Sequence, residues 1–189
     1  MSQVLLVVDV QRCFLNAYTS HIPARVRRLI EQPGHDHVWL TQFINVEDGP
    51  YRELLNWHGG SESPDTDFAP ELAPWTTPDR VFEKPGFTGL PEDLATRLVE
   101  VAPDRVLVVG IDTDMCVLKV AMDVFDLGLR PVVLADCCAS TAGLQAHLAG
   151  LAVLARNIGA NQLRDAGLNE GYLGSPPDDV ARFEAQSES

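Results

Sequence analysis

The chain has 189 residues, of which 46% are hydrophobic, and its 14 Lys and Arg against 27 Asp and Glu give a formal net charge of −13. This length and apolar content fit one globular domain with a core of its own. Because so acidic a surface repels phosphate groups, neither nucleic acid nor a membrane is expected as a partner. The opening MSQVLLVVDVQ has no basic flank, which favours a buried strand over a signal peptide.

The four cysteines form no C-x-x-C pair and no Cys/His cluster with metal spacing, so we expect a reduced, cytoplasmic protein without a structural metal. Cys137 and Cys138 are adjacent, a spacing that suits small core residues better than a disulfide. The five histidines show no ligand spacing and are interpreted as surface or structural residues. Among them, His58 stands beside Trp57 and is the one to test.

Apolar runs and helical patterns alternate along the chain. Three continuous apolar runs predict buried strands, namely VLLVVDV, RVLVVGI and RPVVLAD. HVWLTQFI and RVFEK are two more strand candidates, and the short ANQLRDA is a sixth. Between them, apolar residues at helical spacing predict four helices, carrying Ile22, Val26, Leu29 and Ile30; Leu94, Leu98 and Val99; Leu118, Ala121, Met122 and Phe125; and Leu144, Leu148, Leu151 and Leu154. This alternation predicts an α/β fold, a six-stranded, mostly parallel, doubly wound sheet in a three-layer αβα arrangement.

We expect a single domain over residues 1–175 and an acidic, solvated tail over 176–189. Residues 57–80 contain four prolines and two glycines, a composition that predicts irregular structure over more than twenty residues. The aromatic side chains of this segment favour a packed lid.

Three polar residues stand at predicted strand ends: Asp9 after the first strand, Lys84 at the end of RVFEK, and Cys116 one turn after RVLVVGI. In open parallel sheets, the binding crevice lies beyond the carboxyl ends of the strands, so these residues are expected to meet. Each residue alone also fits an ordinary core, capping or surface role. The coincidence of all three favours chemistry.

A nucleophilic thiol needs help, since its ordinary pKa of about 8.5 leaves little thiolate at neutral pH. If Thr113 caps the following helix, Cys116 falls in the first turn, where the dipole favours an anion. Lys84 would lower the pKa of the thiol further, and Asp9 could act as general base and then acid. The turn GIDTD also supplies backbone N–H groups for an oxyanion hole, and these parts together predict acyl transfer.

The motifs LLVVDVQRCF, FEKPGF, VVGIDTDMCV and LGLRPVVLADCCAS resemble, in order and spacing, those of the isochorismatase-like cysteine hydrolases, a superfamily that includes nicotinamidases, N-carbamoylsarcosine amidases and isochorismatases. The resemblance implies Asp9 as acid and base, Lys84 as the cationic member and Cys116 as nucleophile. It implies a cis peptide between Ile111 and Asp112, with the backbone N–H groups of Asp112 and Cys116 as the oxyanion hole. It also implies a six-stranded parallel sheet and a homo-oligomer, a dimer or tetramer.

The departures from the family pattern are informative. Nicotinamidases follow the TQ of their second strand with a metal-binding Asp-x-His, but here Thr41 and Gln42 are followed by Phe43, Ile44 and Asn45. We therefore expect no metal and no other cofactor, and nicotinamide is not favoured as substrate. Aromatic residues are the candidate pocket walls for a small-molecule substrate, namely Phe14, Phe43, Trp57 and Phe87.

The sequence supports three functional hypotheses. The first is a metal-independent cysteine hydrolase that cleaves a C–N bond of a small amide or ureido compound through a thioester. The second is an isochorismatase-type vinyl ether hydrolase, for which the thiol of Cys116 is superfluous. The third is a catalytically silent scaffold that binds a partner through its acidic tail. Substrate choice is not fixed by the fold.

Overall fold

The computed structural model of the chain describes residues 2–86 and 89–168. The predicted acidic tail, 176–189, and the proposed pocket residue Phe87 lie outside these residues. Among the described residues, no helix is long and apolar enough to cross a bilayer.

Six strands form one sheet in the order β3-β2-β1-β4-β5-β6, and every neighbouring pair is parallel. Their bounds are β1 Gln3–Val8, β2 His37–Phe43, β3 Val81–Lys84, β4 Arg105–Ile111, β5 Pro131–Ala139 and β6 Leu163–Arg164. The predicted α/β class and six-stranded sheet are confirmed, and even the two-residue β6 falls inside the weak ANQLRDA signal.

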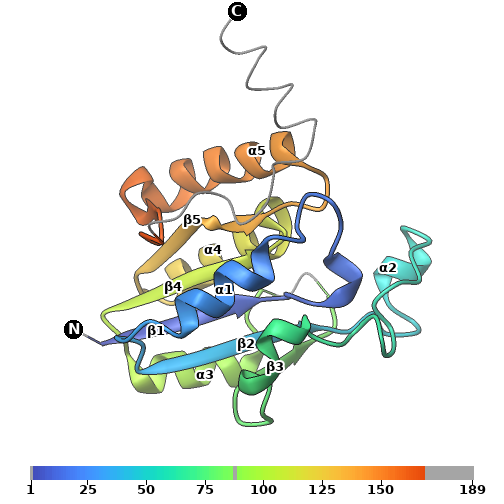
Figure 1. Ribbon diagram of the computed structural model, residues 1–189, viewed down its shortest axis with the longest axis horizontal. Coiled ribbons are helices and arrows are strands. Elements are labelled where there is room, and N and C mark those ends of the chain that lie inside the picture. The colour runs from blue at the N-terminus through green and yellow to red at the C-terminus, as the bar shows by residue number, and fades with distance from the viewer. Residues whose placement is uncertain (1, 87–88, 169–189) are drawn as a thin grey trace, which may run out of the picture.

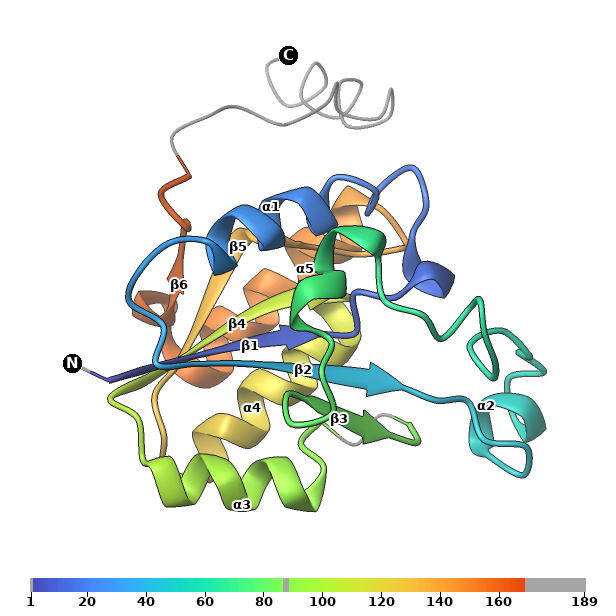
Figure 2. The ribbon, with the colours of Figure 1, turned by 60° about the horizontal axis from the view of Figure 1, so that its bottom comes forward.

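Helices cover both faces of the sheet, as Figures 1 and 2 show. The α-helices are α1 Ile22–Ile30, α2 Pro50–Glu53, α3 Glu92–Val101, α4 Leu118–Asp126 and α5 Leu144–Leu154. Helix α1 packs with the 3-10 helix η2, Pro70–Trp75, on one face, whereas α3 and α4 lie on the other, with α5 packed beside α4. Because both faces are covered, all residues of β1 are buried, which explains its unbroken apolar run.

The predicted helical faces needed three corrections, of which one is Leu148 in α5, which is 42% exposed. In α4 the fully buried residues are Val120, Ala121 and Val124, whereas the predicted Phe125 is 47% exposed. The buried face begins with Val117 in the preceding π-helical turn, so it lies one residue earlier along the chain than the predicted face. In α3 the predicted Val99 is exposed, because it lies five residues beyond Leu94, about 140° around the helix axis.

The segment 57–80 is more ordered than its composition predicts. Its second half includes η2, which begins at Pro70, a position where a missing backbone N–H costs nothing. Leu72 and Ala69 are fully buried, and Phe68 forms an isolated antiparallel bridge with Gln11. The expectation of irregular structure throughout is therefore wrong, because η2 packs Leu72 into the core, whereas the role of the segment as a lid stays a prediction.

Candidate active site

The carboxyl ends of β1, β2, β3 and β4 lie at one edge of the sheet. The parallel register pairs Val8 with both Thr41 and Gly110, and pairs Phe43 with Lys84. In Figure 2 the arrowheads of β1, β2 and β3 point toward the segment that carries α2, which extends beyond this edge. Polar side chains at these strand ends are thus brought together although Asp9 and Lys84 are 75 residues apart in sequence.

Asp9, Lys84 and Cys116 meet at this edge. Lys84 Nζ lies 2.7 Å from Asp9 Oδ2 and 3.4 Å from Cys116 Sγ. Asp9 and Lys84 are fully buried, and Cys116 is 7% exposed. A buried ion pair carries a large desolvation cost, so its contact with a thiol marks the cluster as a candidate active site.

The backbone around Asp9 is unusual. Asp9 has φ +48°, a left-handed conformation that side chains other than Asn, Asp and Gly rarely adopt. Thr41 Oγ1 donates a 2.6 Å hydrogen bond to Asp9 Oδ1, which orients the carboxylate. On the other side, Gly110 has φ +128°, and a Cβ there would lie 2.1 Å from the carbonyl oxygen of Val8. Only glycine lets β4 approach β1 this closely beside the site.

Burial and the neighbouring charges together set the pKa of the Cys116 thiol above its ordinary value. Burial raises the pKa of Cys116, the Asp9 carboxylate raises it further, and Lys84 lowers it by less than these two effects. Burial lowers the pKa of Lys84, but the neighbouring Asp9 and Cys116 more than offset this and leave the pKa above its ordinary value. The expected low-pKa thiolate is therefore not the resting state. Within the cluster, Asp9 is the group placed to accept the thiol proton.

The nucleophile turn differs in detail from the predicted helix start. Cys116 lies in the π-helical turn η3, Thr113–Val117, and the N-cap is Asp112, not Thr113. The Asp112 carbonyl oxygen accepts hydrogen bonds from the N–H groups of Met115 and Val117. The peptide between Ile111 and Asp112 is cis, as the resemblance implied.

Aromatic side chains form a wall beside the cluster. Phe14 and Trp57 are stacked with ring centroids 6.2 Å apart, and Phe43 lies 5.7 Å from Phe14 and 5.8 Å from Trp57. Lys84 Nζ lies 5.7 Å from the centroid of the Phe43 ring, which joins this wall to the buried cluster. The structure therefore brings together three of the four predicted pocket residues.

Sequence reasoning missed Tyr51, which packs edge-on against Phe43 at 4.9 Å. Burial raises the pKa of the Tyr51 phenol, and its interactions with Cys116 and Asp9 raise it further, which places Tyr51 near the cluster. Tyr51 lies in α2, a helix of only four residues, and so short an element leaves no periodic signal in the sequence.

Two amide side chains hold the wall in place. Gln11 is fully buried, and its side chain accepts from the Phe43 N–H and donates to the carbonyl oxygens of Phe43 and Thr66. Asn45 donates to the carbonyl oxygens of Trp57 and Gly59. Asn45 thus fixes the loop of Trp57 at a position where the nicotinamidase pattern has a metal ligand.

The described residues do not fit a metal site, since no group of three or more His, Cys, Asp or Glu side chains is placed to hold an ion. The described histidines have structural or surface contacts: His147 bonds to Thr113, His35 to Gln3, and the exposed His58 to Asn56. Cys137 and Cys138 are free and buried, which confirms their interpretation as core residues. Cys13 is also free, and burial together with Asp65 and Asp9 raises its pKa to about 12.

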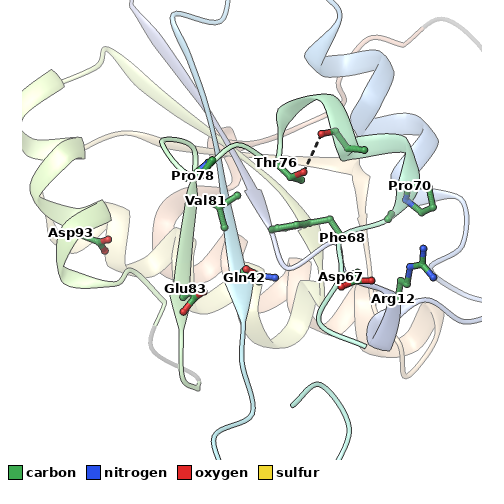
Figure 3. A pocket seen from close by; sticks show the side chains of 12 residues that line it. Arg12, Gln42, Asp67, Phe68, Pro70, Thr76, Pro78, Val81, Glu83 and Asp93 are labelled. Atoms are coloured by element: carbon green, nitrogen blue, oxygen red, sulfur yellow. Dashed lines mark hydrogen bonds between the residues drawn. The ribbon is translucent and has the colours of Figure 1, made fainter. Parts of the chain in front are cut away.

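A separate groove of about 910 Å³ lies at the β3 edge of the sheet (Figure 3). It is lined by Gln42 and Glu83, which alternate along their strands with Phe43 and Lys84 and so face the opposite side of the sheet. Neither Asp9, Lys84 nor Cys116 belongs to its lining, so the groove is distinct from the candidate active site.

Fold and site together define a doubly wound α/β protein with a buried Asp-Lys-Cys cluster at the carboxyl ends of its strands. Residues 3–164 match the isochorismatase domain family, so the chain belongs to this family, whose members are hydrolases. A comparison with curated protein sequences finds no match.

Solved structures share the fold at low sequence identity. N-carbamoylsarcosine amidase from Thermoplasma acidophilum is 22% identical, with a TM-score of 0.73 over 90% of this chain and 100% of that chain. An isochorismatase-like hydrolase from Alkaliphilus metalliredigens is 21% identical, with a TM-score of 0.72 over 87% and 92% of the two chains. Nicotinamidase/pyrazinamidase from Bacillus subtilis is 19% identical, with a TM-score of 0.70 over 87% and 100%.

Proposed function

We propose that the chain is a metal-independent cysteine hydrolase that cleaves a C–N bond of a small amide or ureido compound through a thioester on Cys116. The observation that carries the proposal is the position of Lys84 Nζ, 2.7 Å from Asp9 Oδ2 and 3.4 Å from Cys116 Sγ in a buried cluster. A thiol beside a carboxylate base and a fixed cation is the arrangement that nucleophilic acyl transfer requires.

In the first half-reaction, Asp9 takes the thiol proton while Cys116 Sγ attacks the substrate carbonyl carbon. The N–H groups of Asp112 and Cys116 stabilise the oxyanion of the tetrahedral intermediate, and Lys84 balances the negative charge that passes between Asp9 and Cys116. The C–N bond then breaks as Asp9 returns the proton to the leaving nitrogen, which departs as ammonia or an amine. A thioester remains on Cys116.

In the second half-reaction, Asp9 removes a proton from water, and the resulting hydroxide attacks the thioester carbonyl. The C–S bond breaks, the acyl group leaves as a carboxylic acid, and Cys116 recovers its proton from Asp9. Since the resting thiol is protonated, Asp9 has to act in both halves of the cycle. Lys84 Nζ, 2.7 Å from Asp9 Oδ2, holds the carboxylate in place through both halves.

The site favours this chemistry over the two alternatives. Hydrolysis of a vinyl ether needs an acid but no nucleophile. The contact between the Cys116 thiol and Lys84 would then have no role in the reaction. A silent scaffold would not need a fully buried ion pair beside that thiol. The aromatic wall of Phe14, Phe43, Tyr51 and Trp57 supports a small substrate with an apolar or planar acyl group.

The test is a panel of small amides and N-carbamoyl compounds, assayed for ammonia release with the wild-type chain and Cys116→Ala. We expect turnover of at least one compound, a covalent acyl adduct of Cys116 by mass spectrometry, and a loss of at least about 10³-fold in Cys116→Ala. Cys138→Ala, which removes a buried cysteine in β5, is the matched control. Turnover that survives in Cys116→Ala, or release of pyruvate from isochorismate by that variant, would overturn the mechanism.

A further inference from the structure

The Asp112 side chain does not cap its own helix but binds the segment between β5 and α5. Its Oδ1 accepts a 2.6 Å hydrogen bond from the Thr141 N–H, and its Oδ2 accepts a 2.7 Å hydrogen bond from the Thr141 hydroxyl. Asp112 is only 7% exposed, and its N-cap position carries no side-chain capping bond. Two donors from one residue therefore fix both carboxylate oxygens, and with them the orientation of the Asp112 backbone.

Further contacts hold Thr141 and the helix that follows it, α5, against the nucleophile turn. Thr113 Oγ1 and His147 Nδ1, in α5, lie 2.7 Å apart, and Thr113 is fully buried. Gly150 brings α5 so close to the turn that a Cβ there would lie 2.7 Å from the Asp114 Cα. The Thr141 carbonyl oxygen accepts a hydrogen bond from the Asn16 side chain. The segment that binds Asp112 is thus held by Asn16 on one side and continues into a helix packed on the turn.

We propose that Thr141 is a positioning residue, which acts through the Asp112 carboxylate to hold the Asp112 peptide N–H toward the oxyanion that forms at Cys116. This inference rests on the proposed function. Oxyanion stabilisation depends on donors fixed within a few tenths of an ångström, and a misplacement of about 1 Å costs about 10²-fold in rate. A side chain in contact with neither substrate nor thiol can therefore control the chemical step.

Alkylation and acylation of Cys116 depend on different parts of the site. Alkylation of Cys116 by iodoacetamide is a displacement at a saturated carbon, which forms no oxyanion and depends on the thiol and its charged neighbours. Acylation of Cys116 by p-nitrophenyl acetate forms a tetrahedral oxyanion and depends on the positioned N–H groups. A positioning role predicts that loss of the Thr141 hydroxyl slows acylation and leaves alkylation unchanged.

The experiment measures both rates at Cys116, by p-nitrophenolate release and by peptide mass spectrometry. In Thr141→Val, which keeps the backbone bond and loses the hydroxyl bond, we expect acylation to slow about tenfold and alkylation to stay within about twofold. Thr141→Ser restores the hydroxyl and the acylation rate. The matched control is Ser140→Ala, because the Ser140 hydroxyl contacts the Ala142 N–H and not Asp112.

A double-mutant cycle adds a second readout. Asp112→Ala removes both hydrogen bonds, so we expect a loss of about 10²-fold in acylation, and Thr141→Val should add nothing in that background. Equal acylation in Thr141→Val and wild type, additive losses in the cycle, or a parallel fall in alkylation overturns the inference alone. A wild-type Cys116 that p-nitrophenyl acetate does not acylate overturns the proposed function and this inference with it. Thermal melting confirms that each variant is folded.

Discussion

Two ion pairs of similar length differ in burial and in position. Asp9 and Lys84 lie 2.7 Å apart with both side chains fully buried, and Arg25 and Asp136 lie 2.8 Å apart with side chains 7% and 22% exposed. The second pair joins α1 to β5, and the other oxygen of Asp136 accepts a hydrogen bond from the N–H of Ala166.

The surroundings of the two pairs differ. Arg25 and Asp136 connect elements that pack together, and their partial exposure lowers the desolvation cost. Lys84 instead contacts the Cys116 thiol, the carbonyl oxygen of Gly86 and the Phe43 ring, all in a buried site. Arg25 also acts on a thiol, that of the buried Cys137. The two pairs therefore differ in burial and in place, because only Asp9 and Lys84 stand at the carboxyl ends of their strands, next to the aromatic wall.

The largest expected effect is that of Asp9→Asn. Without the proton acceptor, amide turnover should fall at least about 10³-fold. Alkylation of Cys116 by iodoacetamide should become faster, because loss of the Asp9 charge lowers the thiol pKa and each unit gives about tenfold more thiolate at neutral pH. Slower alkylation in this variant would show that Asp9 does not control the thiol.

Lys84→Met should change the alkylation rate of Cys116 in the opposite direction to Asp9→Asn. Lys84 lowers the pKa of Cys116, so its loss should slow alkylation and shift the alkylation profile to higher pH, along with a loss of turnover. Asp9 is left buried without its cation, which should also reduce the free energy of unfolding by about 3 kcal/mol. Urea denaturation and the pH dependence of alkylation measure the two effects, and an unshifted profile would exclude Lys84 from the site.

Arg25→Met tests the structural pair. It should lower the free energy of unfolding by about 2 kcal/mol, less than for a fully buried pair because Asp136 retains contact with water. The kcat should stay within about twofold. The matched control is Arg27→Met on the same helix, whose exposed pair with Glu31 should contribute under about 0.5 kcal/mol. A loss of activity without a loss of stability in Arg25→Met would break the distinction between the two pairs.

The smallest effect is expected at the aromatic wall. Trp57→Leu removes the ring stacked on Phe14 and should raise KM about tenfold for the best amide of the panel, with kcat changed by less than about threefold. Phe125→Leu, on the exposed side of α4, is the control and should leave both constants unchanged. A fall in kcat alone would assign Trp57 to the chemical step.

Much of the site was predictable because its residues lie at or just after the carboxyl ends of strands. Asp9 and Cys116 follow long apolar runs, Lys84 ends the shorter strand candidate RVFEK, and parallel strands bring their carboxyl ends together. The aromatic wall was predicted only in part, since Tyr51 lies on a four-residue helix without periodicity. The bonds from Thr141 to Asp112 left no signal, because they join a loop to a turn 29 residues away.

The sequence by itself determined the parallel sheet, the order of its elements and the identity of the three strand-end residues, because apolar runs and turn residues act locally. Only the tertiary structure decided the charge state of the site. The pKa of Cys116 depends on its burial and on the competing charges of Asp9 and Lys84, which meet only when the strands pair. The π-helical turn, the buried face of α4 and the contacts of Asp112 were likewise decided by packing, because each depends on residues distant in the chain.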